Sequence, residues 1–256
     1  MRMITALKLL FRYYYRIIPT YLMAAIVLFI GAQLLPLIGA ILLLPLSIGV
    51  AYVMVFEASA IRKRHFFPLF YGFKGGNYTR NVWYLLMRQF VQYLPLGIGV
   101  LLDYIFSGSI PSLGIDLPFM RIGVSFLIFA IPAAIISLLI SMVPYILADP
   151  LYNVKKANPL RISAILLKGN YIKLLIIRLI FMPFILWASS GLILSIIAFY
   201  TSLFGDSIIS PTITTSWLFS APVLFMVFNP WYLMTHAVLY SQIRYKLKDL
   251  MRNYNH

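Results

Sequence analysis

Five ionisable side chains interrupt segments that are otherwise almost entirely apolar, and they are the residues best placed to do chemistry. They are Glu57, Arg88, Asp149, Arg178 and His236. An ionisable group inside a membrane segment costs about 2.5 to 3.5 kcal/mol on insertion scales, so its presence suggests a function or a partner. One interpretation is that the five form one polar cluster that opens toward the cytoplasm, with Glu57 paired to Arg88, and that this cluster is the substrate or proton site of a transporter.

The alternative is that these residues are structural. Arg88 and Arg178 would then extend their long side chains to lipid phosphates. Glu57 and Asp149 would cap helices or pair locally. His236 has no second histidine or carboxylate at ligand spacing, which is typical of a hydrogen-bonded packing residue and predicts no metal site.

Catalytic signatures are absent from the sequence, and we predict no catalytic residue, no cofactor and no enzyme activity. No H-E-x-x-H, G-x-S-x-G or Walker sequence occurs, and the chain has only six acidic residues and three histidines. An intramembrane hydrolase assembled from dispersed residues such as Asp103, Asp116 and Asp206 is the enzymatic alternative. The chain has no cysteine, which excludes disulfides and cysteine-ligated metals.

Membrane-crossing helices are the elements that would position these residues. The 256 residues are 62% hydrophobic and 11% charged, unlike a soluble domain. The apolar runs lack the alternation of barrel strands, and helices of their length cross about 30 Å of hydrocarbon. We expect one all-α transmembrane domain over 1–256, its first span retained rather than cleaved, with six spans near 17–35, 36–60, 81–106, 122–147, 174–199 and 217–240.

The positive charges predict the orientation of these spans. Of the 21 Lys and Arg residues, all except Arg88, Arg121 and Arg178 lie before the first span, after the last, or in the 62–80 and 155–173 loops. Because basic loops remain in the cytoplasm, both termini are expected there. We attribute the net charge of +15 to topology and to anionic lipid, and predict no nucleic-acid partner.

Two segments, 1–16 and 159–168, are expected to lie along the cytoplasmic membrane interface. The first mixes basic residues with Leu, Phe and a run of Tyr. In the second, Asn158 suits the N-cap, Pro159 the first helical position and Gly169 the helix end. The side chains predicted to contact lipid headgroups are Arg12, Arg16, Arg62, Lys63, Arg64, Arg161, Lys168 and Lys173.

A faint internal repeat suggests that the spans form three hairpins. Residues 76–80 read GNYTR before the third span, and 169–173 read GNYIK before the fifth. Each returning span also carries a polar group near its cytoplasmic end. Three related hairpins of one orientation would explain these echoes, and chance similarity among apolar helices is the alternative.

Several short motifs carry a resemblance to a known family. Residues 144–150 read PYILADP, 167–170 read LKGN and 70–74 read FYGFK, while Trp187 and Tyr240 lie in aromatic-rich spans. Together they resemble a family of bacterial integral membrane proteins, domain of unknown function number nine hundred and seventy-five. The chain departs from that pattern in having Trp231 where Tyr is usual and in lacking a Pro-Gly turn before the Tyr of the fourth span. The resemblance implies a six-span protein of a bacterial plasma membrane and implies no reaction.

We therefore expect a non-enzymatic membrane component that binds anionic lipid or a membrane-protein partner, as an accessory subunit for export, envelope maintenance or self-immunity. The alternative is a small transporter or channel whose site is the polar cluster in the cytoplasmic half. Pro144 and Pro230, which free backbone carbonyls within two helices, favour that alternative. The sequence predicts no oligomeric state.

Overall fold

Helices make up nearly all of the chain that the computed structural model describes, which is residues 2–34, 44–59, 68–73, 77–106, 112–117, 120–150, 152, 158–184 and 211–253. The first elements are α1 (Arg2–Arg12), α2 (Tyr14–Leu34), α4 (Leu46–Ser59) and the 3₁₀ helix η1 (Pro68–Phe73). The later ones are α5 (Tyr78–Ile105), β1 (Ser112–Leu117), β2 (Met120–Gly123), α6 (Val124–Leu139), α7 (Val143–Ala148), α8 (Pro159–Leu167), a helical segment at 171–184, and α10 (Pro211–Asn253).

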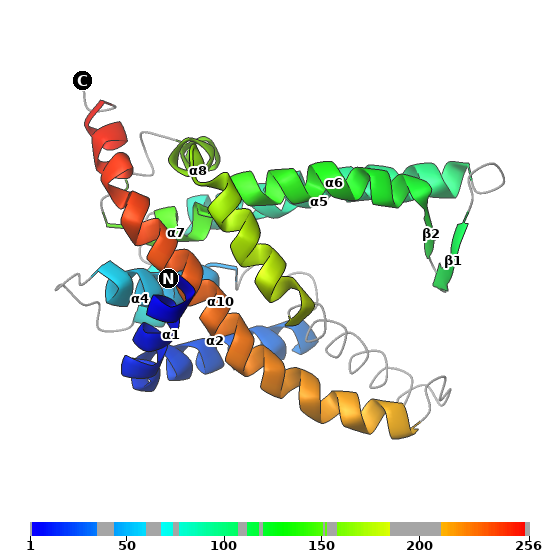
Figure 1. Cartoon of the computed structure of the whole chain (residues 1–256), viewed down its shortest axis with the longest axis horizontal. Helices are drawn as coiled ribbons and strands as arrows, with labels where there is room; N and C mark the ends of the chain where they lie inside the picture. The colour runs from blue at the N-terminus through cyan, green and yellow to red at the C-terminus, as the bar shows by residue number, and fades with distance from the viewer. Residues whose placement is uncertain are drawn as a thin grey trace.

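The short helix α4 lies in the middle of the helical body (Figure 1). Every residue from Ile48 to Phe56 is buried. A helix that is apolar on all sides must be covered on all sides, and α2, α7, α10 and η1 pack around α4. The core of the protein is therefore built around α4.

Helices α5 and α6 lie side by side and extend away from this body as far as β1 and β2 (Figure 1). Among the described residues, two helical stretches are long and apolar enough to cross a membrane, Tyr78–Ile105 and Ile128–Ala148, and they coincide with the third and fourth predicted spans. Only 17% of the apolar window in Tyr78–Ile105 is buried. Its large exposed side chains are Trp83, Phe90, Tyr93, Leu94, Ile98, Leu101, Tyr104 and Ile105.

The predicted helical architecture is confirmed for the described residues, with one difference. β1 and β2 pair antiparallel, with Asp116 opposite Arg121 in the register. The sequence prediction missed them because each strand is short, and their residues were assigned to the loop between two spans and, at 122–123, to the start of the fourth span. Residues 185–199 of the predicted fifth span lie outside the described residues.

Helix α8 begins and ends where the sequence predicts it. The Asn158 side chain accepts a hydrogen bond of 2.9 Å from the backbone N–H of Leu160, and Pro159 occupies the first turn. Gly169 has a φ of +85°, a left-handed conformation that favours glycine. These local signals are sufficient to bound a helix of nine residues.

One residue of α8 supports the break between α6 and α7. The hydroxyl of Ser163 donates to the carbonyl of Leu139 at 2.6 Å and accepts from the N–H of Met142 at 3.2 Å. Both backbone groups belong to the interruption at the end of α6, where the regular helical ladder stops. Ser163 is completely buried, so this contact compensates for polar groups that water does not reach.

Two glycines allow η1 to lie directly against α4. A Cβ on Gly49 would lie 1.9 Å from the carbonyl oxygen of Leu69, and one on Gly72 would lie 2.3 Å from that of Pro45. The rings of Tyr52 and Tyr71 stack across the same contact at 4.1 Å. Asn81 of α5 donates to the Gly72 carbonyl at 2.9 Å, which joins α5 to this close packing.

We predict that Gly49→Ala destabilises the protein by about 1 to 3 kcal/mol, because the backbone at Leu69 must move to accept the methyl group. Gly97→Ala is the matched control, since a Cβ there meets nothing within 4 Å, and removing a glycine from a helix stabilises by about 0.5 to 1 kcal/mol. Reversible unfolding in mixed detergent micelles measures both. Equal effects of the two substitutions would contradict the close approach of η1 to α4.

Candidate functional site

The five predicted site residues do not form one cluster. Glu57, on α4, accepts a hydrogen bond from Arg16 of α2 at 3.3 Å. The Arg16 guanidinium also lies over the ring of Tyr15, 4.7 Å from its centroid. The predicted pairing of Glu57 with Arg88 is therefore wrong, because Arg16 lies at the adjacent end of α2 and reaches the carboxylate first.

Asp149 forms the strongest polar contact of the helical body. Its carboxylate oxygens accept from Arg244 Nε at 2.5 Å and from Arg244 Nη2 at 2.8 Å. The hydroxyl of Tyr240 adds a third bond at 3.0 Å. The Asp149 side chain is 0% exposed and that of Arg244 is 21% exposed. The hydrogen bond from Arg244 to Asp149 raises the pKa of Arg244 because it stabilises the charged guanidinium.

Arg88 and Arg178, in contrast, have no carboxylate partner within the described residues. Each is an electrostatic neighbour of Tyr232, and Arg178 is a neighbour of Arg88, so two positive charges share one region of the fold. Arg178 donates to the hydroxyl of Ser137 and to its carbonyl, both at 2.7 Å, and hydrogen-bonds Tyr232. Within the described residues, the Nε atoms of Arg88 and Arg178 are buried and have no hydrogen-bond partner.

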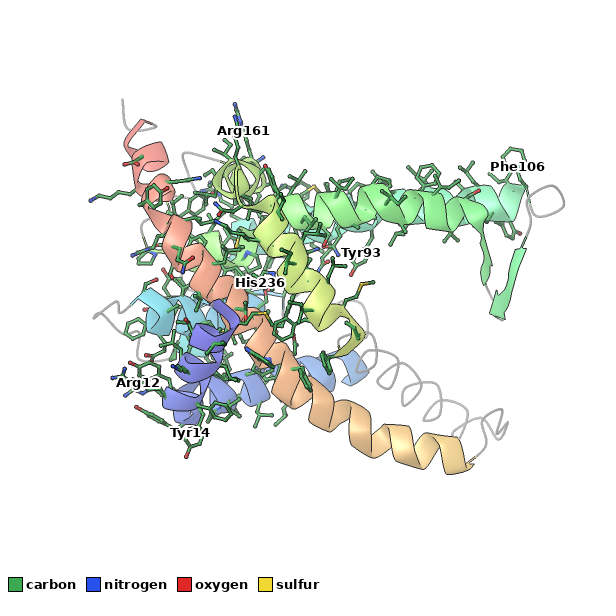
Figure 2. The ribbon with its side chains drawn as sticks, in the orientation of Figure 1. Arg12, Tyr14, Tyr93, Phe106, Arg161 and His236 are labelled. Atoms are coloured by element: carbon green, nitrogen blue, oxygen red, sulfur yellow. The ribbon has the colours of Figure 1, made fainter. Side chains whose placement is uncertain are left out.

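His236 lies beside this arginine pair, in the centre of the molecule (Figure 2). It is 3% exposed. Its Nδ1 is 2.9 Å from the carbonyl oxygen of Tyr232, and its Nε2 has no partner among the described residues. The ring of Tyr145 stacks on His236 at 6.4 Å, while the Tyr145 hydroxyl is occupied by the carbonyl of Leu233 at 2.9 Å. We call Arg88, Arg178 and His236 the arginine cluster.

The sequence reasoning missed the stripe on α10 that links Asp149 to the arginine cluster. Its residues recur at every fourth position, so they share one helix face. Tyr232 is a neighbour of the two arginines, and His236 belongs to the arginine cluster. Tyr240 and Arg244 bind Asp149. The spacing was the available signal, but Arg244 was counted only as a loop charge. The stripe consists of Tyr232, His236, Tyr240 and Arg244.

The residues predicted to contact headgroups divide into an exposed and a paired set. Arg12, Arg161, Lys168 and Lys173 are exposed. Arg12 and Arg161 lie at the periphery of the molecule, on α1 and α8 (Figure 2). Arg16 is paired with Glu57. The predicted headgroup residues Arg62, Lys63 and Arg64 lie outside the described residues.

No family model, curated protein or solved structure matches the chain. The resemblance to domain of unknown function number nine hundred and seventy-five therefore stays a prediction from its motifs. Among the described residues, no group of three or more His, Asp or Glu side chains gathers in a way that could hold a metal ion. Any functional proposal must start from the geometry above.

We predict that Arg244→Leu destabilises the protein more than Asp149→Leu. The first removes the counter-charge of a fully buried carboxylate, at a cost of about 3 to 5 kcal/mol, whereas the second leaves an arginine that can turn toward water. The double substitution should cost less than the sum of the two. Unfolding of all three variants in detergent checks the order, with the exposed Lys248→Leu as the control on the same helix. Additive effects would show that the two side chains are independent.

Proposed function

We propose that this protein is a multi-pass integral membrane protein, with six spans and both termini in the cytoplasm. The observation that carries the proposal is the exposure of α5, which is long enough to cross a bilayer yet is buried over only 17% of its apolar window. A core helix of a water-soluble protein would be covered. A surface of Trp, Phe, Ile and Leu is stable without cover when lipid surrounds it.

The arrangement of the helices supports this orientation. The helix ends that adjoin the basic segments lie on the side of the molecule where the N- and C-termini are labelled. The α5–α6 pair extends away from that side (Figure 1). Phe106, at the end of α5, lies far from Arg12 and Arg161 (Figure 2). One basic side and one apolar arm are what the positive-inside rule requires.

The role we propose is the binding of anionic lipid, or of a membrane-protein partner, through the basic side. There the exposed cations stand next to exposed rings: Arg12 is 5.5 Å from the centroid of Tyr13, and Phe11 and Tyr14 are 68% and 60% exposed. Such a mixture suits the headgroup region, where rings enter the acyl boundary and cations meet phosphate. An accessory subunit of the envelope is the kind of protein this surface supports.

A small carrier or channel is the second candidate, and the arginine cluster favours it. Two guanidinium groups with no carboxylate are suited to an anion rather than to a cation or a proton relay. This candidate requires the cluster to release its ligand on both sides of the membrane. An accessory protein requires only that the ligand stay bound.

We predict that a membrane-impermeant maleimide labels Ser112→Cys on intact cells, while Arg12→Cys and Lys248→Cys react only after permeabilisation. The chain has no cysteine of its own, so each label reports one position. Ser112 belongs to β1, at the far end of the α5–α6 pair, and the other two residues belong to the basic side. Labelling of Arg12→Cys without permeabilisation would contradict the orientation.

We also predict that changing the four exposed cations to Gln lowers the retention of phosphatidylglycerol by about tenfold or more, since each contributes about 1 kcal/mol near an anionic surface. Native mass spectrometry of the protein in maltoside detergent counts the retained lipids. Phosphatidylcholine is the control lipid, and its retention should not change. A protein partner that copurifies and is lost in the same variant would favour the partner form of the proposal. The variant is Arg12→Gln, Arg161→Gln, Lys168→Gln and Lys173→Gln combined.

A further inference from the structure

We infer that the arginine cluster is a binding site for one oxyanion, a phosphate group that carries or adjoins a hydroxyl. The inference rests on the proposed membrane function and names a ligand class for it. The site joins Arg88 of α5, Arg178 of the segment 171–184, and His236 of α10, with Tyr232 as an electrostatic neighbour of both arginines. It differs from the exposed cations of the basic side because both arginines are half-buried and their Nε atoms, like Nε2 of His236, are buried without a partner in the described part of the chain.

The first argument is that, within the described residues, no carboxylate is paired with either of these arginines. The chain contains six acidic residues. Glu57 is engaged by Arg16 and Asp149 by Arg244. Asp103 caps α6, accepting from the N–H of Ser125 at 3.2 Å. Of the other three, Asp116 lies in β1 and Asp249 near the end of α10, and Asp206 lies outside the described residues.

The second argument is energetic. A buried charge without a partner is strongly destabilising, and two like charges in one apolar region add repulsion. Ser137 and Tyr232 supply neutral acceptors to Arg178 only. Arg88 has no hydrogen bond within the described residues, and its charged neighbour there is Arg178. An external anion would therefore stabilise the fold as well as fill the site.

The third argument identifies the anion more closely. A carbonyl oxygen only accepts, so the short contact of His236 Nδ1 with the Tyr232 carbonyl requires the proton on Nδ1. In the neutral ring, Nε2 is then an acceptor without a donor. Guanidinium forks match phosphate oxygens, and a hydroxyl on or beside the phosphate would donate to Nε2. Hydrogen phosphate and the glycerol phosphate of a lipid headgroup share these groups.

The site also borders the exposed surface. Tyr93 is an electrostatic neighbour of Arg88 and is 54% exposed. In the segment 171–184, Ile177 is buried and Leu179 is exposed, so Arg178 stands at the edge between the packed and the open face.

Thermal unfolding of the full chain in phosphate-free maltoside detergent tests the site, with intrinsic tryptophan fluorescence as the readout. The probes are sodium phosphate, short-chain phosphatidylglycerol, short-chain phosphatidylcholine, and sodium chloride at matched ionic strength. We expect a rise in Tm of about 5 to 10 °C at a saturating phosphate-bearing probe, and none with chloride or phosphatidylcholine. A rise with sodium phosphate identifies a free anion, and a rise with phosphatidylglycerol alone identifies a headgroup.

Substitutions then assign the effect to the cluster. Arg88→Gln and Arg178→Gln should abolish the rise, while Lys248→Gln, at an exposed cation that is not one of the four changed in the lipid-retention variant, should keep it. Arg88→Glu places a carboxylate beside Arg178, so its Tm without any probe should exceed that of the wild type and should not respond to phosphate. If one arginine variant fails to fold, this Glu variant still reports on the site.

No rise with either phosphate-bearing probe, or an equal rise in the wild type and in both Gln variants, would overturn the inference. Neither outcome would affect the proposed membrane role, because labelling of the termini and retention of lipid by the exposed cations do not involve Arg88. Loss of that retention together with an intact Tm response would instead contradict the proposed lipid-binding surface and leave the buried site standing.

Discussion

The buried carboxylate of Asp149 is the interaction on which the rest of the helical body depends. It stands at the end of α7, and its partners Tyr240 and Arg244 lie on α10. A carboxylate with no exposed surface is tolerable only when its hydrogen bonds and its counter-charge are all present. The pair therefore fixes the position of α10 against α7. Because Ser163 of α8 holds the break that precedes α7, α8 is tied to the same point.

From this point α10 organises the molecule along one face. Twelve residues separate Tyr232 from Arg244, about 18 Å along a helix, so one stripe reaches both the Asp149 pair and the arginine cluster. Nearer the start of α10, Asn229 donates to the Tyr21 hydroxyl at 2.7 Å and Trp231 to the Met3 carbonyl at 3.1 Å, which ties in the N-terminal helices. A change at the Asp149–Arg244 pair or at the arginine cluster would therefore affect the packing of elements that are distant in sequence.

Local features could be predicted from the sequence, whereas the pairing of charges could not. The bounds of α8 follow from Asn158, Pro159 and Gly169, and α5 from the length of its apolar run, since each signal acts within a few residues. Which cation reaches Glu57 depends on how α2 lies against α4, and this is set by packing. The predicted topology puts several cations at one depth in the membrane. It contains no signal that selects Arg16 among them as the partner of Glu57.

The contrast between the two polar centres argues for a replaceable ligand. The chain neutralises Arg244 with a residue of its own, Asp149, which also accepts a hydrogen bond from Tyr240. A carboxylate near Arg88 would have given the same result, and a single substitution would supply it. Leaving Arg88 and Arg178 without one makes stability at this place depend on something that arrives from outside the chain. That dependence serves a protein whose state must follow the presence of a phosphate-bearing molecule, and it has no value for a purely structural contact.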